Sequence, residues 1–292
     1  MITRFLPRHE CPHPAATLHS VSSLRVWTAE RVTEFEARYA AASKGLTITA
    51  QKVLAWSAAS LRPSPVMVWT PAQTGQFLDG VADDRLYAMW HLFTHTAMRR
   101  GEVCGVSWAD VDLDAGRLEV RIELVQLGYE VAEDRPKTEA SDAPVSLDKA
   151  SVTLLRAWRK QQAAEQLAAG EAWQGSGRVF TKPDGTAYHP QWLTKRFERL
   201  SFGAGVPPIR LHDTRHGAAC LAHAAGASMK AIQALLRHAS YSITADTYTT
   251  VFAELGDALA EDIASVVPRQ RPVGDSSETA GLTTVSHLRK NG

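Results

Sequence analysis

The chain has 292 residues, of which 45% are hydrophobic, so it is long enough for one large domain or two modest ones with a proper core. Its 32 basic and 31 acidic residues give a net charge of +1, which does not by itself favour a nucleic-acid partner. Any surface that binds nucleic acid must therefore be a local basic patch, with the acidic residues segregated elsewhere.

Cysteine usage and the N-terminus bear on the compartment. Cys11, Cys104 and Cys220 are too few and too widely spaced for a disulfide framework. Cys11 and His13 suggest half of a metal site, but no second pair of ligands has a suitable spacing, so we expect no metal. We see no secretory signal and no apolar run that approaches the ~18 residues of a membrane span. The expected compartment is a reducing cytoplasm.

Residues 1 to about 66 predict a short helical N-terminal region. Helix-like patterns cover residues 24–40 and 47–60, and both are rich in alanine. Pro63 and Pro65 then break the chain, which indicates a linker.

A new helical region begins near residue 70. Thr70 can cap a helix, Pro71 suits its first position, and Gln73 completes a capping box. We expect helices over 71–80 and 84–98, and a short one from about Gly101.

A small antiparallel sheet is expected next. Apolar residues alternate along 117–124, which is typical of a strand with one buried face. Shorter strands are expected near 129–131 and 143–147, and Pro136 and Pro144 suggest that the last one lies at an edge.

Helices return in the last part of the chain. They are expected over residues 148–168, 190–205, 212–225, 228–237 and 241–253. An amphipathic helix is expected over 252–267, with one apolar stripe, and the composition of 269–292 indicates a disordered tail. The fold class is therefore mixed, mainly α with a small antiparallel β-sheet.

Four short sequences carry the chemistry. In order they are Thr96-Ala97-Met98-Arg99, Pro136-Lys137-Thr138, His212-Asp213-Thr214-Arg215-His216, and Leu236-Arg237-His238 followed by Tyr248. Arginines, histidines and a late tyrosine are suited to gripping a phosphodiester and attacking it with a phenol. In this order and spacing, the motifs resemble those of tyrosine recombinases, the phage-integrase family. The resemblance covers residues 67–268, with the catalytic integrase domain and its DNA breaking-rejoining fold.

The resemblance assigns two arginines to the phosphate. Arg99 matches the first catalytic arginine and Arg215 the second. A guanidinium keeps its charge and donates paired hydrogen bonds to phosphate oxygens, where charge develops during phosphoryl transfer. Glu102 lies three residues after Arg99 and is expected to pair with it or orient it, and Arg100 to contact the DNA backbone or solvent.

Proton transfer is assigned to three further residues by the resemblance. Lys137, in the predicted hairpin, matches the lysine that protonates the leaving 5′ oxygen. A lysine can serve as this acid when its pKa is lowered, because its ammonium group then gives up a proton more readily. His212 matches the histidine that exchanges a proton with the nucleophile, and His238 matches a donor to a phosphate oxygen. For His216 we expect packing or hydrogen bonding.

Tyr248 is the nucleophile by resemblance, ten residues after His238. Two arginines and a histidine would favour its phenolate. Its attack would give a 3′-phosphotyrosine and a free 5′-hydroxyl, with neither metal nor cofactor. The family resemblance also implies double-stranded DNA, a homotetramer on DNA through the C-terminal helix, accessory DNA-bending or directionality factors, and a nucleoid-associated location.

Two departures concern backbone geometry. The family usually has glycine where Ala97 and Arg237 stand. If these positions need positive φ, Arg237 strains the loop that holds His238 and lowers activity. The N-terminal region is also shorter than the core-binding domain of relatives, so it is either a truncated element or a minimal clamp.

Alternatives to an active recombinase are a catalytically impaired DNA-binding remnant of a mobile element, and a type IB topoisomerase. A third alternative is an unrelated helical metal-binding module. Separately, His91 and His95 have a spacing that can bind zinc. No acidic residue lies between these histidines, so we expect them to pack in the core.

Overall fold

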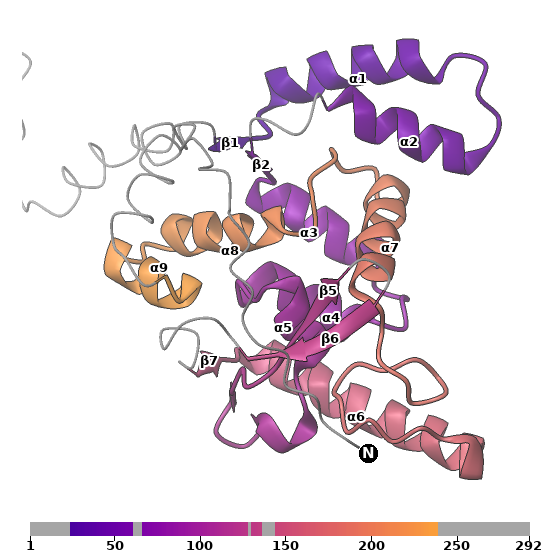
Figure 1. The fold of residues 1–292 in the computed structure, drawn as a ribbon. Helices are drawn as coiled ribbons and strands as arrows, with labels where there is room; N and C mark the ends of the chain where they lie inside the picture. The colour runs from indigo at the N-terminus through magenta and orange to yellow at the C-terminus, as the bar shows by residue number, and fades with distance from the viewer. Residues whose placement is uncertain (1–23, 61–65, 128–129, 136–143, 239–292) are drawn as a thin grey trace, which may run out of the picture. The chain divides into compact units, whose positions relative to one another are not determined.

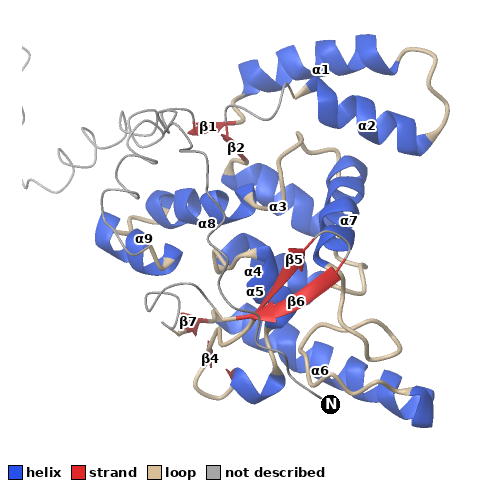
Figure 2. Cartoon of the chain, in the orientation of Figure 1, coloured by secondary structure: helices blue, strands red, loops and turns tan. Residues whose placement is uncertain are grey.

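The computed structural model describes residues 24–60, 66–127, 130–135 and 144–238, which all belong to one compact unit of the chain, Met1–Glu254. Helices predominate (Figures 1 and 2). The strands form three small sheets in this part of the chain. The predicted helices at 241–253 and 252–267 and the tail at 269–292 lie outside the described residues, as does the linker with Pro63 and Pro65.

The N-terminal region forms the two expected helices, α1 (Ala29–Ser43) and α2 (Thr49–Ala59). The first begins later than predicted because residues Leu24–Val26 form strand β1, which pairs in parallel with β2 (Val66–Val68). Thr28 then caps α1 through its side chain. A parallel partner some forty residues away leaves no local signal in the sequence, so this strand was not predicted.

The capped helix predicted after residue 70 is α3 (Pro71–Gly80), with both hydrogen bonds of the capping box present. Helix α4 (Tyr87–His95) is shorter than the predicted 84–98. The Asp84 carboxylate accepts hydrogen bonds from the Leu86 amide and the Trp90 indole and fixes the turn before it. Ala97, at φ 52°, ends the helical path before α5 (Arg100–Gly105).

The prediction of one strand over 117–124 is wrong. Residues Arg117–Leu118 (β4) lie between β3 (Val111–Asp112) and β7 (Val145–Ser146), whereas β5 (Glu123–Leu127) pairs with β6 (Glu130–Asp134). The chain leaves the first sheet because its backbone runs against the glycine face of α5. A Cβ atom added at Gly105 would lie 2.3 Å from the Ile122 carbonyl oxygen. As predicted, β7 is an edge strand.

The later helices match their predicted ranges closely. They are α6 (Lys149–Ala169), α7 (Pro190–Gly203), α8 (Asp213–Ala224) and α9 (Met229–Leu236), with 3-10 turns at Trp108–Asp110 and Gly170–Ala172. Asp148 and Ser228 cap α6 and α9, and Pro190 opens α7.

Aromatic residues join the N-terminal helices to the rest of the core. Tyr39 and Trp56 each contact the Phe202 ring of α7 edge to face, at centroid distances of 6.2 and 5.9 Å. Below them, Trp69 packs on Phe77 and Phe197, and its indole donates to the Pro207 carbonyl. The N-terminal region therefore shares one hydrophobic cluster with α3, α4 and α7.

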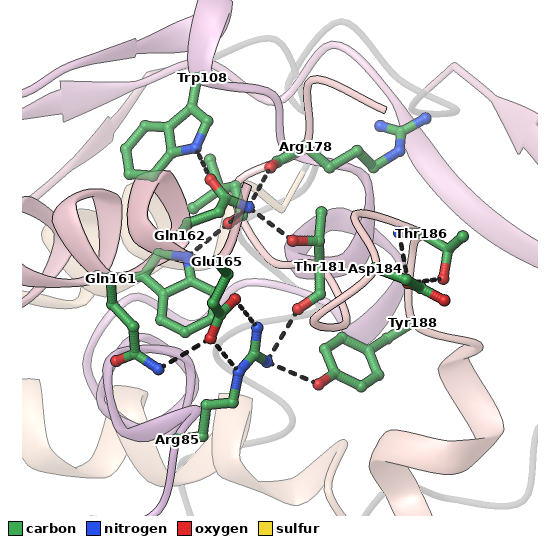
Figure 3. A network of polar contacts seen from close by, with 12 residues as sticks. Arg85, Trp108, Gln161, Gln162, Glu165, Arg178, Thr181, Asp184, Thr186 and Tyr188 are labelled. Carbon is green, nitrogen blue, oxygen red and sulfur yellow. Dashed lines mark hydrogen bonds and ion pairs between the residues drawn. The ribbon is translucent and has the colours of Figure 1, made fainter. Parts of the chain in front are cut away.

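A buried polar network ties α6 to the loop before α7 (Figure 3). The Arg85 guanidinium pairs with Glu165 at 2.5 Å and donates to the Thr181 carbonyl and the Tyr188 hydroxyl. Gln162, one turn away, accepts from the Trp108 indole and donates to the Thr181 hydroxyl. This network fixes the loop through side chains of α6, and none of its residues belongs to a motif of the sequence analysis.

No helix in the described ranges is both long enough and apolar enough to cross a membrane.

Candidate active site

Arg99 lies at the turn between α4 and α5, where Glu102 holds it at two points. The Glu102 carboxylate accepts the Arg99 backbone N–H at 2.6 Å and the Arg99 Nη1 at 2.8 Å. Glu102 is fully buried, whereas the Arg99 side chain is 36% exposed. The expected pairing of these residues is confirmed, and it leaves one edge of the guanidinium open to a ligand.

Arg215, on α8, joins two turns from different parts of the chain. Its Nη1 donates to the Ala97 carbonyl at 2.5 Å, and its Nη2 donates to the Leu236 carbonyl. The first contact lies two residues before Arg99 and the second lies two residues before His238. The buried Arg215 side chain therefore brings the first, third and fourth motifs together.

A pocket of about 570 Å³ opens beside these residues. Arg99, Arg100, Arg210 and His212 line it together with strand β5. Arg100 donates to the Thr194 hydroxyl at 2.7 Å, and Arg210 pairs with Asp213, the first residue of α8. A concave, arginine-rich wall of this kind suits a phosphate group.

His212 and His238 border the same cluster. His212 precedes α8 directly, and its ring lies 5.7 Å from that of His216, edge to face, as the expected packing role of His216 requires. Burial lowers the pKa of His212, and the Arg215 charge adds to this effect. Burial together with Arg215 and Arg99 lowers the pKa of His238 to about 4.

The pKa of His216 is lowered further, to about 3, by burial and by the neighbouring His212. These histidines are therefore neutral at pH 7, and a neutral imidazole can accept a proton at one nitrogen while donating one from the other.

Both suspected glycine positions have the left-handed backbone that favours glycine. Ala97 has φ 52°, and Arg237 has φ 50° and ψ 44° at the C-terminal cap of α9. The condition on which the expected strain at Arg237 depends, a positive φ, is therefore met at both positions. The ion pair between Arg237 and Glu102 was not foreseen, because 135 residues separate the two along the chain.

Four of the six predicted site residues lie in this cluster: Arg99, His212, Arg215 and His238. The other two, Lys137 and Tyr248, lie outside the described residues. The hairpin expected to carry Lys137 is present up to Arg135, and its strand β5 lines the pocket. Arg210 was missed, although its position three residues before Asp213 predicts an ion pair.

The third alternative, a metal-binding module, would need a cluster of metal ligands. Among the described residues, no group of three or more His, Cys, Asp or Glu side chains could hold an ion. His91 and His95 stack at 4.0 Å, and the buried His91 hydrogen-bonds the Ser151 hydroxyl, as expected of a core histidine. The expectation is wrong for His95, which is exposed and makes local contacts with Thr94 and the His91 carbonyl. Cys11 and His13 lie outside the described residues.

The sequence and the fold were compared with those of known proteins. A model of the phage integrase family matches residues 70–254. A XerC-like tyrosine recombinase of Caldanaerobacter subterraneus subsp. tengcongensis is 31% identical over 179 residues, which are 57% of this chain and 46% of that protein. The ICEBs1 integrase of Bacillus subtilis is 24% identical over 197 residues, which are 67% of this chain and 53% of that protein. The chain thus spans about half the length of these curated relatives.

The fold points the same way. The structure of the Tn1549 transposon integrase in complex with transposon right end DNA aligns with a TM-score of 0.54 and 18% identity, covering 79% of this chain and 85% of that one. Its likeness supports a mainly helical fold with small sheets. Because the family model matches more than half of the sequence, the chain belongs to the phage integrase family of tyrosine recombinases.

Proposed function

We propose that this chain is a site-specific tyrosine recombinase that cuts and rejoins double-stranded DNA. The proposal rests on one observation. Arg215 donates hydrogen bonds to the turn before Arg99 and to the turn before His238, and the charges of both arginines act on His238. The relatives named recombinase and integrase support the reaction, and the DNA in the Tn1549 complex supports the substrate.

The proposed reaction has two reversible transfers. The Tyr248 phenol attacks the scissile phosphorus, the bond to the 5′ oxygen breaks, and a 3′-phosphotyrosine forms. A 5′-hydroxyl from a partner strand then attacks that ester and releases the tyrosine. Because the ester conserves the phosphodiester bond energy, the exchange needs no nucleotide cofactor.

Charge stabilisation is the role of the arginines. Arg99 presents its open edge toward the pocket, where it can donate to a non-bridging phosphate oxygen. Arg215 holds the two turns in place and places a second positive charge beside them. Fixed cations that need no reorganisation lower the barrier to phosphoryl transfer most effectively.

Proton transfer is the role of the histidines and Lys137. His212, neutral at pH 7, can accept the phenol proton, and His238 can donate to a phosphate oxygen. Lys137, which comes three residues after the last residue of β6 in the sequence, would protonate the leaving 5′ oxygen. These roles are proposals for each residue.

The remaining assignments concern the assembly. We assign 1–66 to a short helical N-terminal region, which is either a truncated core-binding element or a minimal clamp, 67–268 to the catalytic domain, and 269–292 to a tail. We further assign a homotetramer on DNA through the C-terminal helix, assisted by accessory DNA-bending factors. Its place of action is the cytoplasm, at the nucleoid.

A suicide substrate tests the reaction. A pool of duplexes with a randomised core and one nick is incubated with the protein, and covalent adducts are recovered under denaturing conditions and sequenced. A recombinase forms adducts with a defined core sequence, and Tyr248→Phe abolishes them. Binding without any adduct would contradict the proposal and indicate a DNA-binding remnant. Relaxation of supercoiled DNA without site preference would contradict it in favour of a type IB topoisomerase.

A further inference from the structure

Arg237 is a buried arginine that makes an ion pair across the site. It follows α9 directly, its residue is 4% exposed, and its Nη2 donates to the Glu102 Oε2 atom. Its backbone is left-handed, which L-residues adopt only when the surroundings fix it. A strained backbone and a buried charge at one position need a compensating contact.

Glu102 supplies that contact and is shared with Arg99. The Oε2 atom accepts both the Arg99 backbone N–H and the Arg237 Nη2, and Oε1 accepts the Arg99 Nη1. The carboxylate therefore lies between two arginines that are far apart in sequence. Burial of a carboxylate is tolerated when it is paired and hydrogen-bonded in this way.

The position of Arg237 excludes direct contact with DNA in this conformation. Its Nε and Nη1 atoms are sealed from solvent and have no hydrogen-bond partner in the part of the chain that the structure describes. Leaving such donors unpaired is unfavourable. The Arg237 side chain offers no exposed donor to a substrate, so its contribution to the site comes through its ion pair with Glu102.

We propose that Arg237 is a positioning residue for Arg99, acting through Glu102. This inference rests on the proposed function. Arg237 holds the carboxylate against the α4–α5 turn, so that the carboxylate fixes the Arg99 backbone and one edge of its guanidinium. The opposite edge then faces the pocket in a defined orientation.

Two further observations support the proposal. After burial, which opposes ionisation, the Arg237 charge is the largest influence on Glu102 and helps to lower the pKa of its carboxyl group. The turn that holds Arg237 also holds His238, and its Leu236 carbonyl accepts from Arg215. An ion pair from this turn to Glu102 thus links the two arginines and His238 in one frame.

Single-turnover cleavage of a nicked duplex recovered from the pool tests the proposal. Arg237→Met removes the charge but keeps the length and the backbone strain, and Arg237→Lys keeps the charge. We expect Arg237→Met to slow adduct formation by about 10-fold or more and Arg237→Lys to remain within about 3-fold, since small displacements of a catalytic group have large effects on rate. DNA affinity at fixed salt should change little in either variant.

A double variant separates positioning from an independent contribution. Because Arg237 acts through Glu102, the rate of Arg237→Met combined with Glu102→Gln should be no lower than that of the slower single variant. Multiplied losses, or a wild-type rate in folded Arg237→Met, would overturn the proposal. If Arg237→Met fails to fold, the rates of adduct formation of Glu102→Gln and Arg237→Lys are compared instead. The proposal expects a slow Glu102→Gln variant and an Arg237→Lys variant close to the wild type, and a wild-type rate in Glu102→Gln would overturn it.

A chemical readout keeps the test independent of catalysis. Phenylglyoxal modifies accessible arginines, and peptide mass spectrometry resolves each site. In Arg237→Met, modification at Arg99 should accelerate several-fold, whereas Arg156, which is 52% exposed, pairs with Asp114 and does not line the pocket, should react as before. Unchanged labelling of Arg99 would overturn the positioning role. Absence of adducts with the wild type would refute the proposed function alone.

Discussion

At the scale of single residues, the site depends on two left-handed turns that lack glycine. The Ala97 and Leu236 carbonyls both accept from Arg215, and the residues with positive φ, Ala97 and Arg237, lie at these turns. The turns aim their carbonyls at one guanidinium, so their conformation decides where Arg215 lies. Substitutions that alter these turns should therefore affect stability and cleavage together.

The first prediction concerns Ala97. Glycine there would relieve left-handed strain of roughly 1–2 kcal/mol, but it would lose a buried methyl worth about 0.8 kcal/mol and add about 0.5–1 kcal/mol of chain flexibility. We expect Ala97→Gly to stay within about 1 kcal/mol of the wild type in urea unfolding, because these terms offset each other.

Valine at the same position provides the contrast. A β-branched residue is strained at positive φ and too large for a fully buried site, so Ala97→Val should lose about 3 kcal/mol or more and slow adduct formation. Equal unfolding free energies for the glycine and valine variants would show that this turn does not hold its conformation in solution.

At the scale of elements, the packing of β5 on α5 shapes the pocket wall. Cβ atoms at Gly101 and Gly105 would lie 2.8 Å from the Leu124 carbonyl oxygen and 2.3 Å from the Ile122 carbonyl oxygen. The strand backbone lies too close for any side chain on this face of the helix. Arg99, directly before α5, is thereby brought to the strand that lines the pocket.

The second prediction follows from this contact. Gly105→Ala must push backbone away from backbone, so we expect a loss of about 2–3 kcal/mol in unfolding free energy and slower cleavage. The matched control is Gly217→Ala in α8, where an added Cβ meets nothing within 4 Å. There, alanine should stabilise the helix by roughly 0.5–1 kcal/mol. Equal changes in unfolding free energy for the two variants would contradict the close approach of this backbone to α5.

The same elements explain what could be predicted from the sequence. Thr70 signals a helix start locally, so the start of α3 was placed at Pro71, and the predicted ranges of α6 and α9 also lie within a residue of those observed. The split between β4 and β5 was missed because it depends on glycines of a different element, and alternation alone cannot reveal it. The arginines and histidines were found by motif order.

What the motifs could not predict were contacts between distant segments. The pair between Arg237 and Glu102 and the parallel pairing of β1 with β2 each join segments far apart in the chain. One sequence carries no signal for such pairs. The departure from glycine at position 237 nevertheless drew attention to this residue, because a left-handed turn restricts the residue type whatever its partner is.

At the scale of the whole molecule, the N-terminal helices belong to the same core as the catalytic region. Trp56 is 3% exposed and packs on Phe202 of α7, and Arg38 donates to the Ala59 carbonyl and so joins α1 to α2. Shared packing predicts cooperative unfolding of the two regions rather than independent behaviour. This is the property that a minimal clamp fixed to the catalytic domain would require.

The third prediction tests that shared core. Trp56→Ala removes a large buried ring, so we expect a loss of about 3–5 kcal/mol and a single unfolding transition at lower urea. Circular dichroism and tryptophan fluorescence should report the same midpoint. A separate early transition of the N-terminal helices, with the catalytic region unchanged, would show instead that the two regions fold independently.

The fourth prediction concerns acid. Burial lowers the pKa of His91 to about 4, with His95 adding to the effect and Asp148 opposing it, and burial likewise lowers that of His216 to about 3. In the unfolded chain a histidine titrates near pH 6.5, so between about pH 6.5 and 4 the unfolded state binds more protons than the folded state. The free energy of unfolding should therefore fall as the pH is lowered through this window.

His91 offers a test outside the active site. Asparagine can replace its hydrogen bond to Ser151 but cannot be protonated in this range. Between pH 6.5 and 5, the wild type should lose about 1–2 kcal/mol more than His91→Asn, whatever their difference at pH 7. Urea unfolding at several pH values measures both slopes, and parallel slopes would show that His91 does not contribute to acid sensitivity. Protonation of these buried histidines favours the unfolded state. The free energy of unfolding should therefore be lowest at acid pH, where His238 of the active site also becomes charged.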